Sequence, residues 1–401
     1  MSDKNNETMK PGWHRVKFGE VVRLSKARSQ DPLADGIERY VGLEHLEPGG
    51  LRIRSWGSVA DGVTFTSVFQ PGQVLFGKRR AYQRKVAVAD FSGVCSGDIY
   101  VLETKDAQLL LPELLPFICQ TDAFFDHAVG TSAGSLSPRT NWTSLADFEF
   151  LLPNIELQEK ITKRLLAIRD AVHAAEDAFF QSIQLTQSLR NSLLEELTSE
   201  FGNVPLGEHA EGLMGFAFKS EDFVQNGVQL LRMGSLFGRQ LDLNRDPVFL
   251  PREFEHQYEK FLLHPGDIVL SMTGTTGKQD YGFAVKLPDG TPSLLLNQRV
   301  IKIVPDYVLR SDYLLQILWS SAFLSQVYRL SPGSKQANLS KSDLMKIGIP
   351  VPPLDRQKEV AEMISNCMDA TESLFLRAGS LKAILKLQQH AHPSLSGELH
   401  V

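Results

Sequence analysis

The sequence predicts an α+β protein in which one unit, a strand-rich globular domain followed by a long helix, occurs twice. Two observations predict this fold. The segment that begins at Ser132 corresponds to the segment that begins at Ser331, at a constant offset of 199 residues. In both copies a heptad pattern of apolar residues follows this segment. The predicted parts are a globular domain at 11–153, a helix at 154–201, a second globular domain at 202–352 and a second helix at 353–391.

Both globular domains are predicted to be mixed α/β and rich in short strands. Short apolar runs bounded by turn residues predict strands at Gln73–Phe76, Lys85–Ala89, Asp98–Glu103, Asp267–Met272 and Arg299–Val304. Each domain has one predicted helix, at about Leu111–Val129 and Ser311–Tyr328. The segment at 71–76 corresponds to 265–270 at a different offset, which indicates insertions and deletions within the domains.

Each long helix is predicted to begin after a proline that ends the preceding strand, Pro153 in the first copy and Pro352 in the second. Apolar or small residues then recur at alternating steps of four and three. They are Ile161, Leu165, Ile168, Val172, Ala175, Phe179, Ser182, Thr186 and Leu189 in the first copy, and Val360, Ile364, Cys367, Thr371, Leu374, Ala378, Leu381, Leu385 and Gln388 in the second. Two seams in identical register predict a coiled coil. The alternative is a pair of amphipathic helices that each pack on their own domain.

The composition limits the possible classes of protein. The net charge is −5, so any contact with nucleic acid must use a local basic surface or a partner's charge. Cys95, Cys119 and Cys367 form no CxxC pair and predict reduced thiols in a cytoplasmic protein. The first residues are polar, unlike a signal peptide, and no apolar run is long enough to cross a bilayer.

Motifs for catalysis or cofactor binding are not found in the sequence. Residues 274–278 (GTTGK) have two residues between the glycines where a phosphate-binding loop has four, and Gln279 follows where Ser or Thr is required. Residues 130–134 (GTSAG) match a nucleophile elbow, but they follow a predicted helix, whereas the elbow follows a strand. The histidines have no zinc-site spacing. We therefore expect no catalytic residue, metal site or cofactor in this chain.

The order of these segments resembles the specificity subunits of type I restriction–modification systems. The resemblance rests on PVPPLDRQKEVAEMI (350–364), its degenerate copy LPNIELQEKITKRL (152–165) and PGDIVLSMTGTTGK (265–278). The first domain departs from the family pattern, because GKRRAYQRK (77–85) stands where the second domain has the GTTGK segment.

The resemblance implies a non-catalytic subunit that recognises DNA. In this family each globular domain is a target-recognition domain that reads one half of a split sequence in double-stranded DNA. The two helices pack as an antiparallel spacer with pseudo-two-fold symmetry. Two methyltransferase subunits carry S-adenosylmethionine, and restriction subunits supply ATP- and Mg-dependent translocation and cleavage. Two alternatives remain: a DNA reader of another methyltransferase-based defence system or an unaccompanied regulator, and a coiled-coil protein scaffold that does not bind DNA.

Candidate DNA-binding residues are those that can reach phosphates or base edges. The densest basic cluster contains Lys78, Arg79, Arg80, Tyr82, Gln83, Arg84 and Lys85. In the second domain the corresponding loop contains Ser271, Thr273, Thr275, Thr276, Lys278 and Gln279, and glycines 274 and 277 are expected to let backbone donors approach phosphate. Further candidates are Arg139, Asn141, Arg232, Gln298, Arg299, Lys335, Gln336 and Asn338. The seam from Ile161 to Leu189 would extend about 42 Å, or roughly 12 base pairs.

Overall fold

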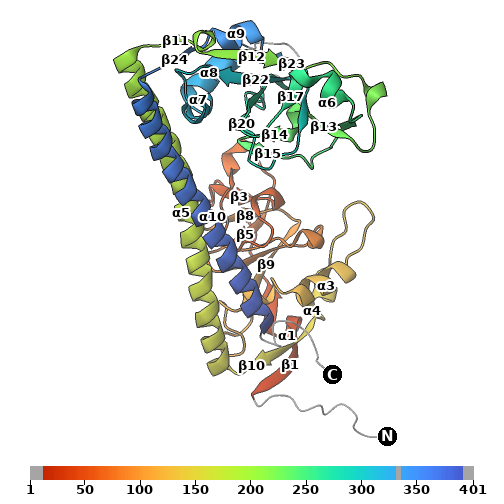
Figure 1. The fold of residues 1–401 in the computed structure, drawn as a ribbon. Coiled ribbons are helices and arrows are strands. Elements are labelled where there is room, and N and C mark those ends of the chain that lie inside the picture. The colour runs from red at the N-terminus through yellow and green to blue at the C-terminus, as the bar shows by residue number, and fades with distance from the viewer. Residues whose placement is uncertain (1–11, 276, 331–335, 392–401) are drawn as a thin grey trace. The chain divides into compact units, whose positions relative to one another are not determined.

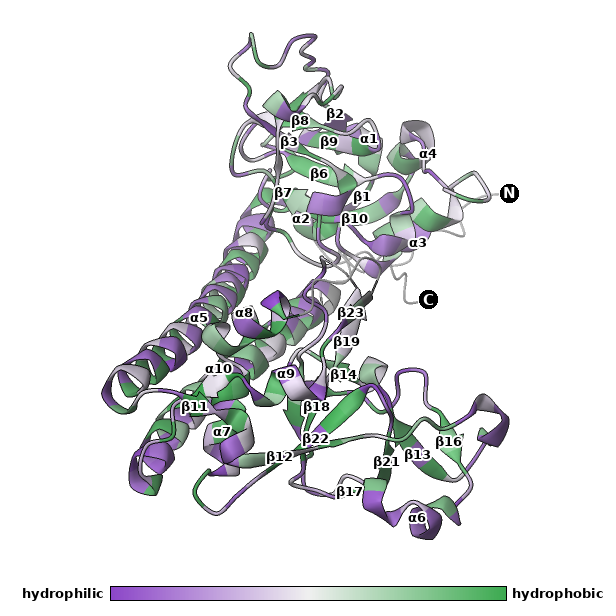
Figure 2. Cartoon of the chain, turned by 90° about the horizontal axis from the view of Figure 1, so that it is seen from above, coloured by the Kyte–Doolittle hydropathy of each residue, from purple (hydrophilic) through white to green (hydrophobic). Residues whose placement is uncertain are grey.

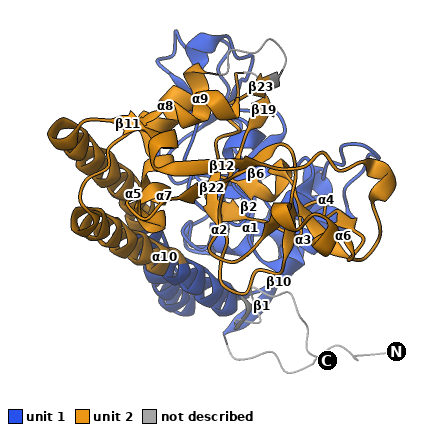
Figure 3. Cartoon of the chain, turned by 45° about the horizontal axis from the view of Figure 1, so that its top comes forward, with its two compact units in different colours: residues 1–176, 376–401 blue, residues 177–375 orange. Residues whose placement is uncertain are grey.

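The computed structural model describes residues 12–275, 277–330 and 336–391. The chain divides into two compact units, residues 1–176 with 376–401 and residues 177–375 (Figure 3). Each unit contains one globular domain together with parts of both long helices (Figure 1).

The globular domain of the first unit contains two four-stranded sheets. One has the order β2 (Val22–Leu24), β9 (Ile99–Thr104), β6 (Val74–Gly77) and β7 (Val86–Val88), and all of its pairs are antiparallel. The other has the order β4 (Gly57–Ser58), β3 (Arg39–Val41), β8 (Gly93–Cys95) and β5 (Ser67–Phe69), with β3 and β8 parallel. A separate antiparallel ribbon of β1 (Trp13–Lys17) and β10 (Glu149–Pro153) leads to the first long helix.

The second unit repeats this topology strand for strand. One sheet has the order β12 (Ala210–Met214), β22 (Val300–Pro305), β18 (Ile268–Ser271) and β20 (Ala284–Lys286). The other has the order β16 (Phe249–Leu250), β13 (Val228–Leu231), β21 (Leu294–Leu296) and β17 (Leu262–Leu263). The parallel pair is again the central one, β13 with β21, and the ribbon is β11 (Val204–Pro205) with β24 (Gly348–Ile349). The predicted duplication and the strand-rich α+β class are thus confirmed.

The prediction of a single helix in each globular domain is wrong, because the structure has two shorter helices in its place. The first copy has α2 (Leu115–Ile118) and α3 (Asp122–Gly130), and the second has α7 (Ser311–Leu318) and α8 (Ser321–Arg329). The break lies at Thr121 and at Ser320. Each hydroxyl donates to a carbonyl of the preceding helix and accepts the amide of Phe124 or Phe323, so it caps the next helix.

Several shorter elements complete the fold. The remaining helices of four or five residues are α1 (Phe18–Val21), α4 (Trp142–Ala146), α6 (Phe254–Gln257) and α9 (Lys341–Met345). Two small ribbons occur in the second unit, β14 (Leu236–Phe237) with β15 (Gln240–Leu241) and β19 (Thr273–Thr275) with β23 (Gln336–Asn338).

The long helices are α5 (Ile155–Phe201, 47 residues) and α10 (Leu354–Ala391, 38 residues). The same hydrogen bonds fix the start of each helix. The side-chain amide of Gln158 donates to Leu109 O (2.8 Å) and Pro153 O (2.9 Å), and its oxygen accepts the Leu111 amide (3.0 Å). Gln357 makes the corresponding bonds to Val308, Pro352 and Arg310, each 199 residues later.

All of the predicted seam residues are buried or half-buried, and none is exposed. In the first unit Glu176 of α5 pairs with Lys382 of α10 at 2.6 Å. In the second unit the rings of Phe179 and Phe375 lie 5.4 Å apart, and Ser182 Oγ lies 2.6 Å from Thr371 Oγ1. Later positions on α5 therefore meet earlier positions on α10, so the helices pack antiparallel and the coiled-coil prediction is confirmed.

The hydrophobic cores tie these helices to the domains. In the first unit Ile161 and Leu165 of α5 join a core built on Phe76 and Phe124, while a second core fills the space between the two sheets around Phe69 and Leu75. The second unit has the same two layers. Figure 2 shows that central strands such as β13 and β18 are largely hydrophobic, whereas hydrophilic and hydrophobic residues alternate along both long helices. The three cysteines are free. Among the described helices, none is long and apolar enough to span a membrane.

Candidate nucleic-acid interface

The two predicted DNA-contacting loops occupy equivalent places in the two units. After β6, the Lys78 amide donates to Asp98 O (3.0 Å), and Lys78 O accepts the Thr140 amide (3.1 Å). After β18, the Met272 amide donates to Arg299 O (2.9 Å), and Met272 O accepts the Leu339 amide (2.9 Å). Each loop therefore lies between the same two neighbouring segments.

This arrangement brings together candidates that are far apart in the sequence. We define loop site 1 as residues 78–85, 96–98 and 137–141, and loop site 2 as residues 272–280, 297–299 and 336–339. The backbone of Arg79 forms an antiparallel β-bridge with that of Arg139 in loop site 1, and Thr273 of β19 lies opposite Asn338 of β23 in loop site 2. Of the predicted residues, Arg232 is exposed and lies before a short 3₁₀ turn outside both sites.

The tip of loop site 1 is a tight turn at Ala81–Gln83. Arg80 and Arg84 flank the turn with φ values of 54° and 55°, in the left-handed region that is unfavourable for residues with a side chain. The Arg80 amide donates to Pro138 O at 2.7 Å and fixes the turn against the neighbouring segment. Ala81 is buried, whereas 56% of Tyr82 is exposed. The turn therefore presents Tyr82 to solvent with Arg80 and Gln83 beside it.

Carboxylates within the domain compensate much of the basic charge of loop site 1. Asp98 pairs with Arg79 (3.2 Å) and with Arg139 (2.7 Å). Burial acts to raise the pKa of Asp98, but hydrogen bonds from the two guanidiniums hold it below its ordinary value. The Lys78 ammonium lies 4.6 Å from the centre of the Tyr100 ring, and burial lowers its pKa.

Two further basic side chains of the cluster bind their own domain. Arg84 pairs with Asp122 and stacks on Phe125, and Lys85 Nζ donates to Leu43 O at 2.7 Å. Among the described residues Arg80 has no carboxylate within ion-pair distance. Within this cluster we therefore retain the turn at 80–83 as the part available for DNA.

Loop site 2 is built from a two-stranded ribbon. Ser271 and Thr273 are buried, with the Ser271 hydroxyl accepting the Phe283 amide (3.0 Å) and the Thr273 hydroxyl donating to Met233 Sδ (2.9 Å). Both hydroxyls thus serve the fold, and we leave these two residues out of the DNA-contacting set. The exposed candidates are Thr275, Lys278, Gln279, Gln298, Arg299 and Asn338. Thr276, Lys335 and the side chain of Gln336 lie outside the described residues.

The two glycines of this loop are required by the loop's own packing and backbone conformation. A side chain at Gly274 would collide with Asp280 and Tyr281. Asp280 accepts the Thr275 amide at 2.6 Å, and although burial acts to raise the pKa of Asp280, this hydrogen bond helps to hold it below its ordinary value. One backbone donor of this loop, the Thr275 amide, is therefore already bonded within the loop. Gly277 has φ of +79°, which a residue with a side chain adopts only with strain.

Other predicted features have local structural roles. The side chain of Asn141 accepts the Ser144 amide at 2.8 Å and caps α4. The segment at 130–134 follows helix α3, which is not the strand-to-helix geometry of a nucleophile elbow. Within the described ranges, no cluster of three His, Cys, Asp or Glu side chains could hold a metal ion.

Asp98, Ser137 and Asp280 were missed by the sequence reasoning, although all three organise the loops. Ser137 Oγ accepts a hydrogen bond from Arg79 at 3.0 Å. Residues 96–98 precede β9 as residues 297–299 precede β22, at an offset of 201. That correspondence was available as a signal for Asp98. It also shows that loop site 1 has an aspartate where loop site 2 has Arg299.

Parts of the sequence are similar to known proteins. Residues 198–374 match the family model described as type I restriction modification DNA specificity domain. The chain is 27% identical over 242 residues to the type I restriction enzyme EcoDI specificity subunit of Escherichia coli, covering 56% of this chain and 52% of that protein. It is 26% identical over 390 residues to the MjaVIII specificity subunit of Methanocaldococcus jannaschii, covering 88% and 85%. The chain thus spans about half of the EcoDI subunit and most of the MjaVIII subunit.

Solved structures support the fold. A chain from a type I restriction–modification system gives a TM-score of 0.56 at 18% identity, covering 98% of this chain and 100% of that one. The type I restriction–modification S subunit from M. genitalium gives 0.55 at 13% identity, covering 98% and 97%. The resemblance of this chain to type I restriction–modification specificity subunits is confirmed.

Proposed function

Because residues 198–374 match a type I restriction modification DNA specificity domain, we propose that this chain is the non-catalytic DNA-specificity subunit of a type I restriction–modification enzyme. The observation that carries the proposal is the duplication of one loop site, in equivalent backbone frames, with different side chains in the two copies. A reader of a bipartite target needs two surfaces of equivalent geometry and different chemistry, because each surface meets a different half-site.

The residues proposed to contact DNA are the candidates that are not buried and whose side chains are not engaged by a carboxylate, an aromatic ring, a backbone carbonyl or a helix cap of their own domain. In loop site 1 these are Arg80, Tyr82 and Gln83. In loop site 2 they are Thr275, Lys278, Gln279, Gln298, Arg299 and Asn338. Arginine, glutamine and asparagine side chains can make paired hydrogen bonds to base edges in the major groove, while lysine acts on phosphates. Arg232, which is exposed outside both loop sites, remains a further candidate.

The proposed partners supply the chemistry that this chain does not. Two methyltransferase subunits would carry S-adenosylmethionine, and restriction subunits would use ATP and Mg²⁺. The antiparallel helices would fix the number of unread base pairs between the half-sites, because each helical residue adds about 1.5 Å. A DNA reader of another methyltransferase-based system would share both loop sites, so co-purification with restriction subunits separates it from the leading proposal.

DNA binding by the complex with methyltransferase subunits tests the proposal against a protein-only scaffold. We expect affinity for a duplex to fall steeply with salt, and Lys278→Ala to weaken binding and reduce the salt slope by about one. The matched control is Lys358→Ala, an exposed lysine on α10 that pairs with Glu362. Binding that is independent of salt, or equal losses for the two variants, would exclude the proposed role of loop site 2.

A further inference from the structure

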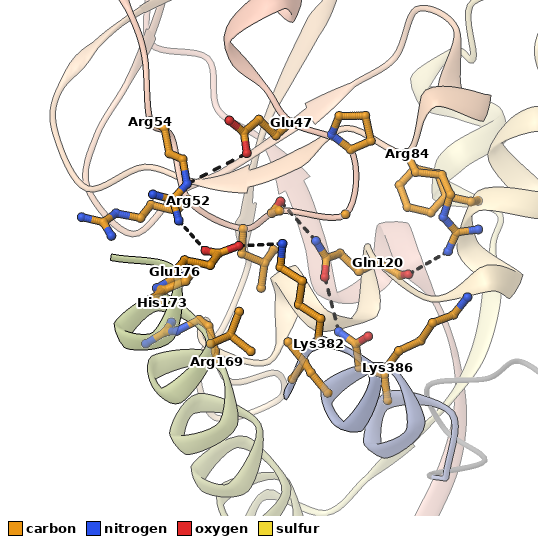
Figure 4. A pocket seen from close by; sticks show the side chains of 18 residues that line it. Glu47, Arg52, Arg54, Arg84, Gln120, Arg169, His173, Glu176, Lys382 and Lys386 are labelled. Atoms are coloured by element: carbon orange, nitrogen blue, oxygen red, sulfur yellow. Dashed lines mark hydrogen bonds and ion pairs between the residues drawn. The ribbon is translucent and has the colours of Figure 1, made fainter. Parts of the chain in front are cut away.

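The first unit contains a cavity of about 320 Å³ that no step of the proposed function uses. Five parts of this unit line it: the segment at 47–54, Arg84, the region of Gln120 and Phe125, the first half of α5 and the last part of α10 (Figure 4). Glu176 and Lys382 form an ion pair at 2.6 Å in this lining (Figure 4).

Comparison with the second unit explains why the space is open. At an offset of 199, Gln120 corresponds to Trp319 and Gln389 corresponds to Arg190. At an offset of 190, Gly49 corresponds to Arg239. In the second unit these large side chains fill the position, with the guanidinium carbons of Arg190 and Arg239 lying 5.7 and 5.0 Å from the Trp319 ring centre.

Smaller side chains stand at this position in the first unit. Gln389 Nε2 lies 3.4 Å from Gln120 Oε1, and Gln120 Nε2 donates to Gly50 O at 3.2 Å. Three large groups are thus replaced by two amides and a glycine. The cavity therefore results from specific residues of the first copy.

The charge of the cavity lining is strongly positive. Six cationic side chains line it, against the carboxylates of Glu47 and Glu176: Arg52, Arg54, Arg84, Arg169, Lys382 and Lys386. Glu176 is bound by both Arg54 and Lys382. Arg84 and Arg169 pair with Asp122 and Asp170, which lie outside the lining. Positive charge is still in excess, although the chain as a whole carries −5.

Two lining residues are suited to recognition. Lys386 has no carboxylate within ion-pair distance among the described residues. His173 is half-buried; burial and the nearby Arg169 lower its pKa, so its ring is neutral at pH 7 and can exchange hydrogen bonds. Apolar surface is supplied by Leu51, Phe125, Val172 and Leu385.

We propose that this cavity binds a small phosphate-bearing molecule of nucleotide size. Its volume is at the lower end of the range for ligand pockets, about 300–1,000 Å³. Guanidinium and ammonium groups are the donors that hold phosphate through charge-assisted hydrogen bonds, and the six cations of the lining outnumber its two carboxylates. The phosphates lie toward Arg169, Lys382 and Lys386, and the organic part packs against Phe125 and Leu51.

Calorimetric titration of the full chain with ADP and with pyrophosphate tests this site. We expect both probes to bind at low salt and Lys386→Glu to weaken binding at least tenfold. Gln120→Trp introduces into the first unit the large side chain that Trp319 supplies at the equivalent position of the second unit, and it should abolish ADP binding. Lys358→Glu, a charge reversal on the exposed face of α10, is the control and should bind as the wild type does.

The outcomes are decisive in either direction. Absence of ADP and pyrophosphate binding, or equal affinity in Lys386→Glu and Lys358→Glu, would overturn the proposal. Because Lys386 is exposed, Lys386→Glu should fold as the wild type does. This variant therefore tests the binding site even if Gln120→Trp fails to fold. Pyrophosphate binding without ADP binding would overturn the assignment of a nucleotide-sized ligand. The result is independent of DNA recognition, since variants of loop site 2 should leave ADP affinity unchanged.

Discussion

Two glutamines hold the starts of the long helices in place. Gln158 and Gln357 are buried, and each side chain satisfies two carbonyls and one amide of the segment that precedes or faces its helix. A shorter side chain cannot reach these groups, which explains why a glutamine stands at this position of the junction between domain and helix in both copies.

Gln357→Ala should therefore lower the free energy of unfolding by about 2 kcal/mol or more, because it leaves the carbonyls of Val308 and Pro352 without their donor. Urea unfolding of the variant measures the loss. Gln184→Ala, at an exposed position of α5, is the matched control and should change stability by less than about 0.5 kcal/mol. Equal effects at the two positions would contradict the role assigned to Gln357.

Arg190 is a buried cation without a carboxylate partner among the described residues. Its guanidinium donates to Gln316 Oε1 at 3.0 Å, and its Nη1 has no partner. Burial and the nearby Arg239 lower the pKa of Arg190 to about 10, so it remains charged at neutral pH.

Arg190→Met should raise the midpoint of thermal unfolding at pH 7, because it removes this buried charge and keeps most of the volume. The folded-state pKa lies below the unfolded value, so the penalty is fully present below pH 10 and shrinks as the pH rises above it. The gain from Arg190→Met should shrink in the same range, which unfolding measured from pH 7 to 11 will show. A lower midpoint in Arg190→Met would mean that the cation stabilises the fold.

At the scale of elements, the polar residues in the helix seam bond to one another. Thr371 Oγ1 donates to Cys367 O at 2.8 Å, so the hydrogen bond between Ser182 and Thr371 is donated by Ser182. The cost of placing these polar groups in the seam is thus offset by a hydrogen bond that requires the two helices to be in register.

A double-mutant cycle measures this bond. Ser182→Ala and Thr371→Val should each cost about 1 kcal/mol, and the double variant should cost less than the sum by at least about 0.5 kcal/mol. The readout is urea unfolding. Strictly additive losses would show that the two hydroxyls do not interact.

At the scale of the whole molecule, the sequence predicts the parts that repeat and misses those that depend on distant partners. The heptad seams and the strands follow from local periodicity, so Ile161 and Val74 could be placed from the sequence alone. The break at Thr121 was missed because a cap inside an apolar run leaves the helical period intact. The pairing of Arg79 with Asp98 and Arg139 was missed because the fold brings these segments together.

Helix length is predicted to set the spacing of the DNA target. One heptad added to α5 after Ala178 and one added to α10 after Phe375 keep both seams in register and lengthen each helix by about 10 Å, or roughly 3 base pairs. The number of unread base pairs should rise, and both half-sites should stay the same. Methylation mapping with this variant checks the prediction, and an unchanged spacer would show that the helices do not act as a ruler.

The central claim is that two loop sites read two half-sites. Methylome sequencing of cells that express this chain with its methyltransferase subunits tests it most directly, with wild type compared to a Lys278→Ala, Gln279→Ala variant. The account predicts a bipartite methylated sequence with an unread middle, and relaxed specificity in one half-site only for the variant. Absence of specific methylation, or a change in both half-sites at once, would contradict it.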